Sequence, residues 1–355
     1  MQQKLKRGVL LFIAIAYISI GNSQTKEAKI DALLNNNFNS NTTGATVLIT
    51  KKGKTIYRKA FGLANLELGI KMRPENVFEI GSMTKQFTAI SILMLVEQGK
   101  ISLQDEITKY IPDYPTHGQK ITIHHLLNHT SGIKSYTSMR KLFDIARNDM
   151  KPLELIHFFK DEPVDFNPGE QYKYNNSAYI ILGYIIEKTS KISYAEYVQK
   201  NIFDKLNMTN STYASHTKII KNRASGYQNK KGYQNAMYIS HTLPYAGGSL
   251  MSTIDDLNIW QKALTNNKLL KKETLQKAYT NYTLNNGEKI NYGYGWNIKI
   301  INNEVSYEHG GSIFGYKSMG IYIPNKDVYV VILTNCNCIS PTKITREITR
   351  LILKD

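Results

Sequence analysis

Cysteine is scarce in this chain: Cys336 and Cys338 are the only two, and a single residue separates them. Residues i and i+2 of a strand project to the same face without the geometry of a disulfide, so a bridge over this span would be strained. The sequence therefore predicts free thiols. A chain of 355 residues, 42% of them hydrophobic, has enough apolar side chains for a sizeable core without disulfide support.

Long apolar runs and long basic runs are also scarce. After residue 20 no apolar segment approaches the roughly 20 residues that cross a bilayer. The formal net charge is +17, but the lysines are scattered, as at Lys51, Lys54 and Lys71, and no nucleic-acid motif is present. We interpret this charge as a solvated surface and expect no nucleic-acid partner. The sequence also lacks internal repeats and low-complexity tracts.

The first 23 residues have the composition of a secretory signal. A basic head, Lys4, Lys6 and Arg7, precedes an apolar run over residues 9–20 and small or polar residues at 21–23. This order predicts cleavage after Ser23 and export to the periplasm or the extracellular space. The alternative is an uncleaved anchor, which would be the protein's one membrane contact. Removing 23 residues and three positive charges leaves 332 residues with a charge of +14.

Strand patterns lie at both ends of the chain and helical patterns lie between them. Residues 45–50 and 55–60 alternate as in a hairpin, and residues 85–98 form a helix with almost no polar face. Other expected helices cover 122–128, 152–160, 177–188 and 194–206, and residues 252–255 resemble a capping box. Further strands are expected at 294–301, 305–309, 316–323 and 328–335, before a last helix from Pro341.

This order predicts an α+β fold with two lobes. One antiparallel sheet is built from both termini and flanked by helices, and an all-helical lobe is inserted into it. We place the sheet lobe at about residues 24–80 and 250–355 and the helical lobe at about 81–249, within one domain over 24–355.

Ser82 and Lys85 form the first candidate catalytic pair. Residues i and i+3 of a helix share a face, so Ser-x-x-Lys can place an amine beside a hydroxyl. The pattern occurs six times here, but only Ser82 follows a glycine and opens a long buried helix. The helix N-terminus there supplies N–H groups and positive potential for a developing anion. The alternative is that Ser82 only caps the helix.

Two further motifs carry groups that suit acyl transfer. In Tyr174-Asn175-Asn176, a phenol can relay a proton and a carboxamide can hold both substrate and lysine. In His309-Gly310-Gly311-Ser312, which we place at a strand end, the glycines would let a substrate backbone lie close. The amides of Ser312 and Ser82 would then form an oxyanion hole. The alternatives are a tyrosine packed under a helix cap and a glycine turn with a surface histidine.

Together, Gly81-Ser82-Met83-Thr84-Lys85, Tyr174-Asn175-Asn176 and His309-Gly310-Gly311 resemble the class C β-lactamase and D,D-peptidase family. The stretches 105–115, 125–132, 166–170, 247–253 and 333–335 are similar to other landmarks of that family. The resemblance implies a β-lactamase/transpeptidase-like fold with the site between the lobes. It implies that Ser82 attacks a carbonyl, Lys85 and Tyr174 share proton transfer, and Asn176 orients lysine and substrate.

His309 departs from the family pattern, where a lysine is common. A lysine would meet a substrate carboxylate as a fixed cation, whereas an unperturbed histidine is charged only below about pH 6.5. The departure weakens the β-lactamase interpretation without affecting hydrolysis. Lys85 must be neutral to act as a base, so we expect burial or a neighbouring cation to lower its pKa.

We therefore expect a serine hydrolase that forms an acyl-enzyme at Ser82 on amide or peptide bonds of the D,D-peptidase type, including cell-wall peptide. The alternatives are an esterase, a β-lactamase, and a non-catalytic penicillin-binding sensor. No cofactor is expected. His125 and His129 have i, i+4 spacing, but no glutamate follows the first as in metalloproteases, so no metal is expected either.

Overall fold

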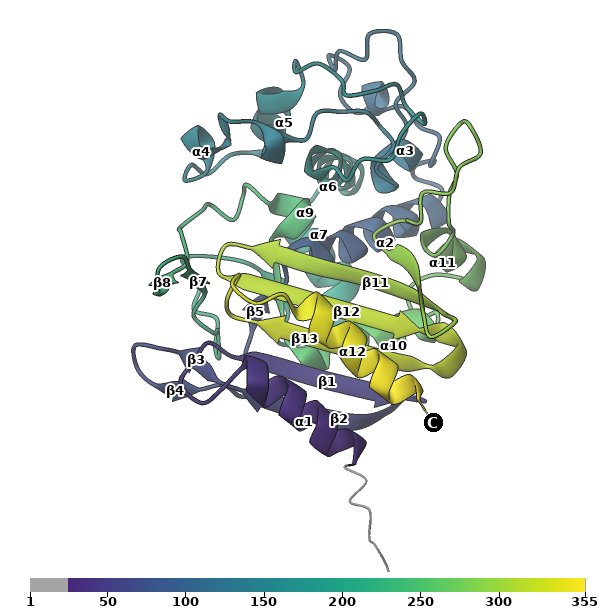
Figure 1. The fold of residues 1–355 in the computed structure, drawn as a ribbon. Helices are drawn as coiled ribbons and strands as arrows, with labels where there is room; N and C mark the ends of the chain where they lie inside the picture. The colour runs from purple at the N-terminus through teal and green to yellow at the C-terminus, as the bar shows by residue number, and fades with distance from the viewer. Residues whose placement is uncertain (1–24, 355) are drawn as a thin grey trace, which may run out of the picture.

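The computed structural model describes residues 25–354 (Figure 1). The expected signal segment, residues 1–23, lies outside the described residues. The main sheet is antiparallel and has the strand order β10-β11-β12-β13-β1-β2. Its strands are β1 (Ala45–Lys51), β2 (Lys54–Phe61), β10 (Asn297–Ile301), β11 (Glu304–Ile313), β12 (Tyr316–Ile323) and β13 (Val328–Thr334). Because β1 pairs with β13, the sheet joins the two ends of the chain, and the expected α+β fold is confirmed.

Short strands connect this sheet to the rest of the molecule. They are β3 (Leu63–Asn65), β4 (Ile70–Lys71), β5 (Phe78–Glu79), β6 (Thr212–Tyr213), β7 (Tyr227–Asn229), β8 (Tyr233–Asn235) and β9 (Leu250–Ser252). β5, β9 and β6 form a small sheet of their own, which leads the chain directly into the turn that holds Ser82.

Both faces of the main sheet are covered. In Figure 1, α1 (Lys26–Asn37) and α12 (Pro341–Leu353) lie across one face. Val330 and Ile332 of β13 pack toward these two helices, whereas Val331 and Leu333 pack into the larger core on the other side. Because both faces of β13 are buried, its sequence is a continuous apolar run and does not alternate between apolar and polar residues.

The remaining helices lie on the other side of the sheet and above it in Figure 1. They are α2 (Thr84–Glu97), α3 (Ile123–Leu127), α4 (Leu142–Ile145), α5 (Pro152–Phe159), α6 (Asn176–Ser190), α7 (Tyr194–Val198), α8 (Asp204–Leu206), α9 (Tyr245–Gly248), α10 (Ile254–Thr265) and α11 (Lys272–Ala278). As its pattern predicts, α2 is buried on all sides from Thr84 to Leu95. Within residues 25–354, no helix is both long enough and apolar enough to cross a bilayer. The lobe boundaries stay a prediction.

Three expected elements outside the candidate site differ from the structure in detail. The helix expected over 194–206 is interrupted by a π-helical turn, Gln199–Phe203, whose wider geometry lets the adjacent Ile202 and Phe203 both reach the core. β10 begins at Asn297 rather than at 294, because Gly295 turns the chain at φ +87°. The cap of α10 is Thr253 rather than Ser252, since Ser252 still belongs to β9.

The prediction of free thiols is wrong. Cys336 and Cys338 are joined by a disulfide, with their Cα atoms 5.2 Å apart. β13 ends at Thr334, so the two cysteines lie in a turn and not at i and i+2 of a strand. The turn brings the Cα atoms to the usual separation for a disulfide.

Candidate active site

Ser82 lies in a 3-10 turn, Gly81–Met83, between β5 and the N-terminus of α2. Two glycines let this turn lie against β11. A Cβ on Gly81, whose φ is +52°, would be 2.9 Å from the nitrogen of Ser312, and a Cβ on Gly311 would be 2.0 Å from the carbonyl oxygen of Ile80. The close approach of two backbones therefore places the half-exposed Ser82 beside the strand that carries the His-Gly-Gly motif.

Lys85 is fully buried one turn further along α2. Its Nζ lies 3.3 Å from Ser82 Oγ, 2.8 Å from Asn176 Oδ1 and 2.9 Å from the carbonyl oxygen of Gly247. Burial lowers the pKa of Lys85 from 10.5 to about 7. The expectation that burial lowers the pKa of this lysine agrees with the structure, and its role as a base stays a prediction.

The contacts of Lys85 also orient its lone pair. The amide oxygen of Asn176 and the carbonyl oxygen of Gly247 can only accept hydrogen bonds, so they take the two hydrogens of a neutral amine. The remaining direction on Nζ points to Ser82 Oγ. In the neutral amine this direction holds the lone pair, which can accept the hydroxyl proton of Ser82.

Asn176 is the first residue of α6 and is itself held by a loop. Its Nδ2 donates to Thr137 Oγ1 at 2.9 Å, and its backbone N–H donates to Ser135 Oγ at 3.2 Å. These bonds fix which end of the carboxamide faces Lys85. The roles of Ser135, Thr137 and the carbonyl of Gly247 could not be predicted from the sequence, because a hydroxyl in an irregular loop and a backbone carbonyl leave no recognisable pattern.

Tyr174 lies above Lys85, with its ring centre 4.9 Å from Nζ. Although 37% of the residue's surface is exposed, the side chains packed around the phenol raise the pKa of Tyr174, and a hydrogen-bonding contribution from Ser82 partly offsets that rise. The ring of His129 packs against the ring of Tyr174, with 4.4 Å between their centres. Tyr174, Lys85 and Ser82 are thus neighbours, as the Tyr-x-Asn motif requires.

His309 is buried and is not the surface residue of the alternative interpretation. Its Nδ1 bonds to the carbonyl oxygen of Gly310 at 2.6 Å, so Nδ1 carries the proton and Nε2 accepts from the hydroxyl of Tyr292 at 3.1 Å. Burial, with a smaller effect of the charge on Lys85, lowers the pKa of His309 to about 3. His309 is therefore a neutral group at physiological pH.

The strand does not end at His309, as the sequence analysis expected, but continues to Ile313. β10 pairs with β11 only from Glu304 to Glu308. The segment from His309 to Ile313 remains paired with β12 and extends beyond β10, next to Ser82. Gly310, Gly311 and Ser312 thus lie on a strand edge beside the nucleophile. The oxyanion hole formed by the amides of Ser82 and Ser312 stays a prediction.

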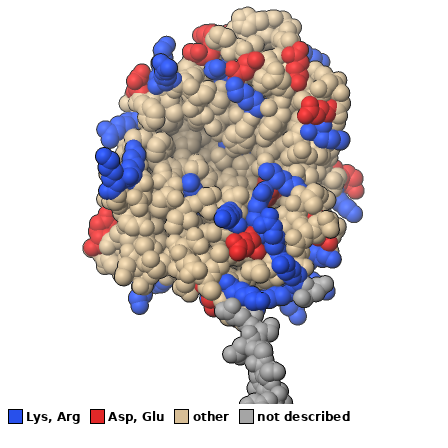
Figure 2. Space-filling model, in the orientation of Figure 1, with Lys and Arg blue, Asp and Glu red and all other residues tan. Residues whose placement is uncertain are grey.

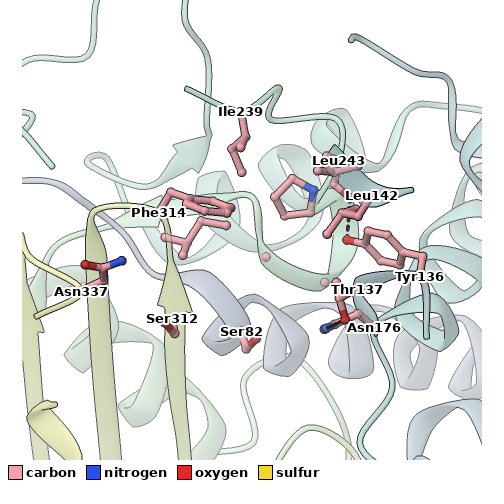
Figure 3. A pocket seen from close by; sticks show the side chains of 14 residues that line it. Ser82, Tyr136, Thr137, Leu142, Asn176, Ile239, Leu243, Ser312, Phe314 and Asn337 are labelled. Atoms are coloured by element: carbon pink, nitrogen blue, oxygen red, sulfur yellow. Dashed lines mark hydrogen bonds between the residues drawn. The ribbon is translucent and has the colours of Figure 1, made fainter. Parts of the chain in front are cut away.

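Ser82 separates two hollows. The first, of about 250 Å³, is lined mainly by apolar side chains and appears in Figure 3 with Ser82 and Asn176 at its floor. The second, of about 360 Å³, contains Tyr174, His309 and the α12 N-terminus. Figure 2 shows the molecule hollowed on this face, with mostly uncharged residues around the opening. The arrangement offers the nucleophile to a substrate that extends to both sides.

The histidines around residue 125 bind or pack against other residues. His124 bonds Tyr294, His125 caps α3 and His129 packs on Tyr174. Within residues 25–354, no three His, Cys, Asp or Glu side chains are arranged to hold a metal ion.

Comparison with known proteins supports the resemblance. The Beta-lactamase family model matches residues 27–350. Penicillin-binding protein 4* of Bacillus subtilis is 29% identical over 310 residues, and protein flp of Staphylococcus aureus is 27% identical over 315 residues. These matches cover 80% and 87% of this chain. The relatives are longer, and the chain spans 66% and 63% of their length.

Solved structures of similar fold agree with this family match. An octameric penicillin-binding protein homologue from Pyrococcus abyssi has a TM-score of 0.78 at 32% identity, covering 92% of this chain and 76% of that chain. A penicillin-binding protein from Bacillus halodurans has a TM-score of 0.80 at 26% identity, covering 91% and 98%. A D-amino acid amidase from Ochrobactrum anthropi shares the fold at 22% identity, with a TM-score of 0.79 and coverage of 92% and 96%. The chain therefore belongs to the Beta-lactamase family, a family of serine acyl hydrolases.

Proposed function

We propose that this protein is an exported serine hydrolase that forms an acyl-enzyme at Ser82 and cleaves amide or peptide bonds of the D,D-peptidase type. The observation that carries the proposal is the environment of Lys85. A fully buried amine with a pKa of about 7 has two fixed acceptors and directs its third position to Ser82 Oγ. A structural lysine in this place would gain nothing from a lowered pKa.

The proposed reaction uses the side chains around Ser82 in turn. Lys85 accepts the Ser82 proton as Oγ attacks the carbonyl carbon. The oxyanion forms beside the amides of Ser82 and Ser312. Tyr174 passes a proton to the leaving amine as its bond to the acyl carbon breaks, and regains one from Lys85. A water molecule then attacks the ester carbonyl carbon while Lys85, again neutral, accepts a proton from it. The bond from that carbon to Ser82 Oγ breaks as Lys85 returns the proton to Oγ, and the acid product leaves.

Two observations bear on the alternatives. His309 is neutral, so it offers no fixed cation to a substrate carboxylate, which favours an esterase over a β-lactamase as the second candidate. The complete set of Ser82, Lys85, Tyr174 and Asn176 speaks against a silent sensor, since binding alone does not need all four.

The test is labelling with a fluorescent fluorophosphonate and a fluorescent penicillin, compared with Ser82→Ala and Lys85→Ala. We expect both variants to lose labelling while keeping the Tm of the wild type within a few degrees. Turnover is then measured with D-Ala-D-Ala peptides, a chromogenic cephalosporin and short acyl esters. A penicillin label that persists without any turnover would favour the sensor. Wild-type labelling of Lys85→Ala would refute the proposed base.

Export is a separate part of the proposal and depends on the basic head and apolar run of residues 1–20. Mass spectrometry of the protein expressed with its full sequence in a bacterium should find a mature N-terminus at Gln24 outside the cytoplasm. An intact N-terminus in the cytoplasmic fraction would contradict it.

A further inference from the structure

The two hollows beside Ser82 differ in chemistry. Six apolar side chains line the first one: Leu142, Ile239, Leu243, Pro244, Ile313 and Phe314. Figure 3 shows Phe314, Ile239 and Leu142 above Ser82, and the ring of Tyr136, held by a bond from its hydroxyl to the carbonyl of Leu243, at one side. Most of the residues that line the second hollow have polar side chains, such as Asn297, Ser318 and Thr342, and among them only Lys317 carries a fixed charge.

The position of Tyr174 tells which part of a substrate enters which hollow. Tyr174 lines the second hollow and does not line the first. If Tyr174 protonates the leaving group, the leaving group departs on its side, into the polar hollow. The acyl part, which stays on Ser82 Oγ, must then extend the other way, past Asn176 and into the apolar hollow.

We infer that the first hollow binds an apolar chain on the acyl part of the substrate. This chain is larger than the methyl group of alanine. The inference rests on the proposed acyl-enzyme at Ser82 and narrows its substrate class to amides, peptides or esters of a bulky apolar acyl group with a small polar leaving group. The residue before the cleaved bond would then be larger than the alanine of D-Ala-D-Ala peptides. A volume of about 250 Å³ is below the roughly 300–1,000 Å³ of pockets that enclose a whole ligand, so it suits one side chain.

The packing explains why the hollow stays open and apolar. Tyr136, Ile239 and Leu243 are themselves buried and cannot turn away from it. Asn337 reaches its rim from the turn between β13 and α12, where the disulfide between Cys336 and Cys338 closes the chain on either side of it. Burial of a methylene group in an apolar site is favourable. Each additional methylene of the substrate that enters this hollow should therefore raise kcat/KM about fourfold.

The experiment uses two substrate series: p-nitrophenyl acetate, butyrate and hexanoate, and the amides of alanine, leucine and phenylalanine in both enantiomers. We expect kcat/KM to rise along each series, by at least about tenfold from acetate to hexanoate. The variant Leu142→Asp places a charge in the hollow and should lower the hexanoate-to-acetate ratio at least about tenfold.

Phe143 supplies the matched control. It follows Leu142 on α4, but it is 63% exposed and does not line the hollow. Phe143→Asp should keep the wild-type ratio of kcat/KM for hexanoate to kcat/KM for acetate. The fraction of each preparation that a fluorophosphonate labels corrects for misfolded protein. A labelled enzyme whose kcat/KM does not rise along the series, or a Phe143→Asp variant that loses the ratio equally, would overturn this inference alone. An unlabelled enzyme without turnover would overturn the proposed function itself.

Discussion

The imidazole of His129 accepts the backbone N–H of Asn175 at Nδ1, over 3.1 Å. The carbonyl oxygen of His129 accepts the backbone N–H of Lys173 over 3.0 Å, so one residue holds both neighbours of Tyr174. His129 adopts a left-handed conformation, with φ at +63°, and is completely buried. Because Nδ1 is an acceptor, the neutral ring carries its hydrogen on Nε2, where it has no polar partner within residues 25–354.

This contact predicts that His129 positions Tyr174. His129→Ala should lower the acylation rate about 10²-fold, because Tyr174 would lose its alignment. The double variant His129→Ala/Tyr174→Phe should acylate no more slowly than Tyr174→Phe alone, since the two changes remove one function. Rates come from fluorophosphonate labelling. Additive losses would instead mean that His129 only supports the fold. His124→Ala is the control, because His124 bonds Tyr294 away from Ser82.

The lowered pKa of Lys85 predicts the pH dependence of acylation. Below pH 7 the amine is protonated and cannot accept the Ser82 proton, and above it the neutral fraction rises. We expect the rate of fluorophosphonate labelling to increase about tenfold per pH unit at low pH and to level off near pH 7. Labelling that keeps rising to pH 10 would show that Lys85 has an ordinary pKa and would contradict its role as base.

We predict that His309 acts in the candidate active site as a neutral hydrogen-bonding group and not as a cation. Its pKa of about 3 leaves it neutral across the working pH range. His309→Gln, which is also neutral, should lower kcat/KM but leave the midpoint of the pH profile where Lys85 sets it. A midpoint that moves by a full pH unit in this variant would indicate that His309 titrates in the wild type.

Gly311 and Gly310 should differ sharply in their tolerance of a methyl group. A Cβ on Gly311 would lie 2.0 Å from the Ile80 carbonyl oxygen and 2.4 Å from Ser318 Oγ, so Gly311→Ala must push β11 away from Ser82. The proposed oxyanion hole would open, and kcat should fall about 10²–10³-fold. A Cβ on Gly310 would meet nothing closer than Met319 Sδ at 3.2 Å. Gly310→Ala should therefore lower kcat much less than Gly311→Ala does. Steady-state kinetics of both variants on the same substrate would measure this difference.

The sequence by itself determined the family, the order of strands and helices, and the identity of the candidate groups. Local rules suffice for these. A helix apolar on all sides, as at α2, must be buried, and Ser82 and Lys85 are three residues apart on it. The hairpin of β1 and β2 and the last helix follow from periodicity in the same way.

Only the tertiary structure decided the chemistry of those groups. The lowered pKa of Lys85 comes from burial by distant segments and its orientation from Asn176 and Gly247, 91 and 162 residues away. His309 is neutral because of what surrounds it, and the cysteines form a disulfide because the chain turns there instead of continuing a strand. Desolvation and hydrogen bonding depend on neighbours in space, which no local pattern in the chain can specify.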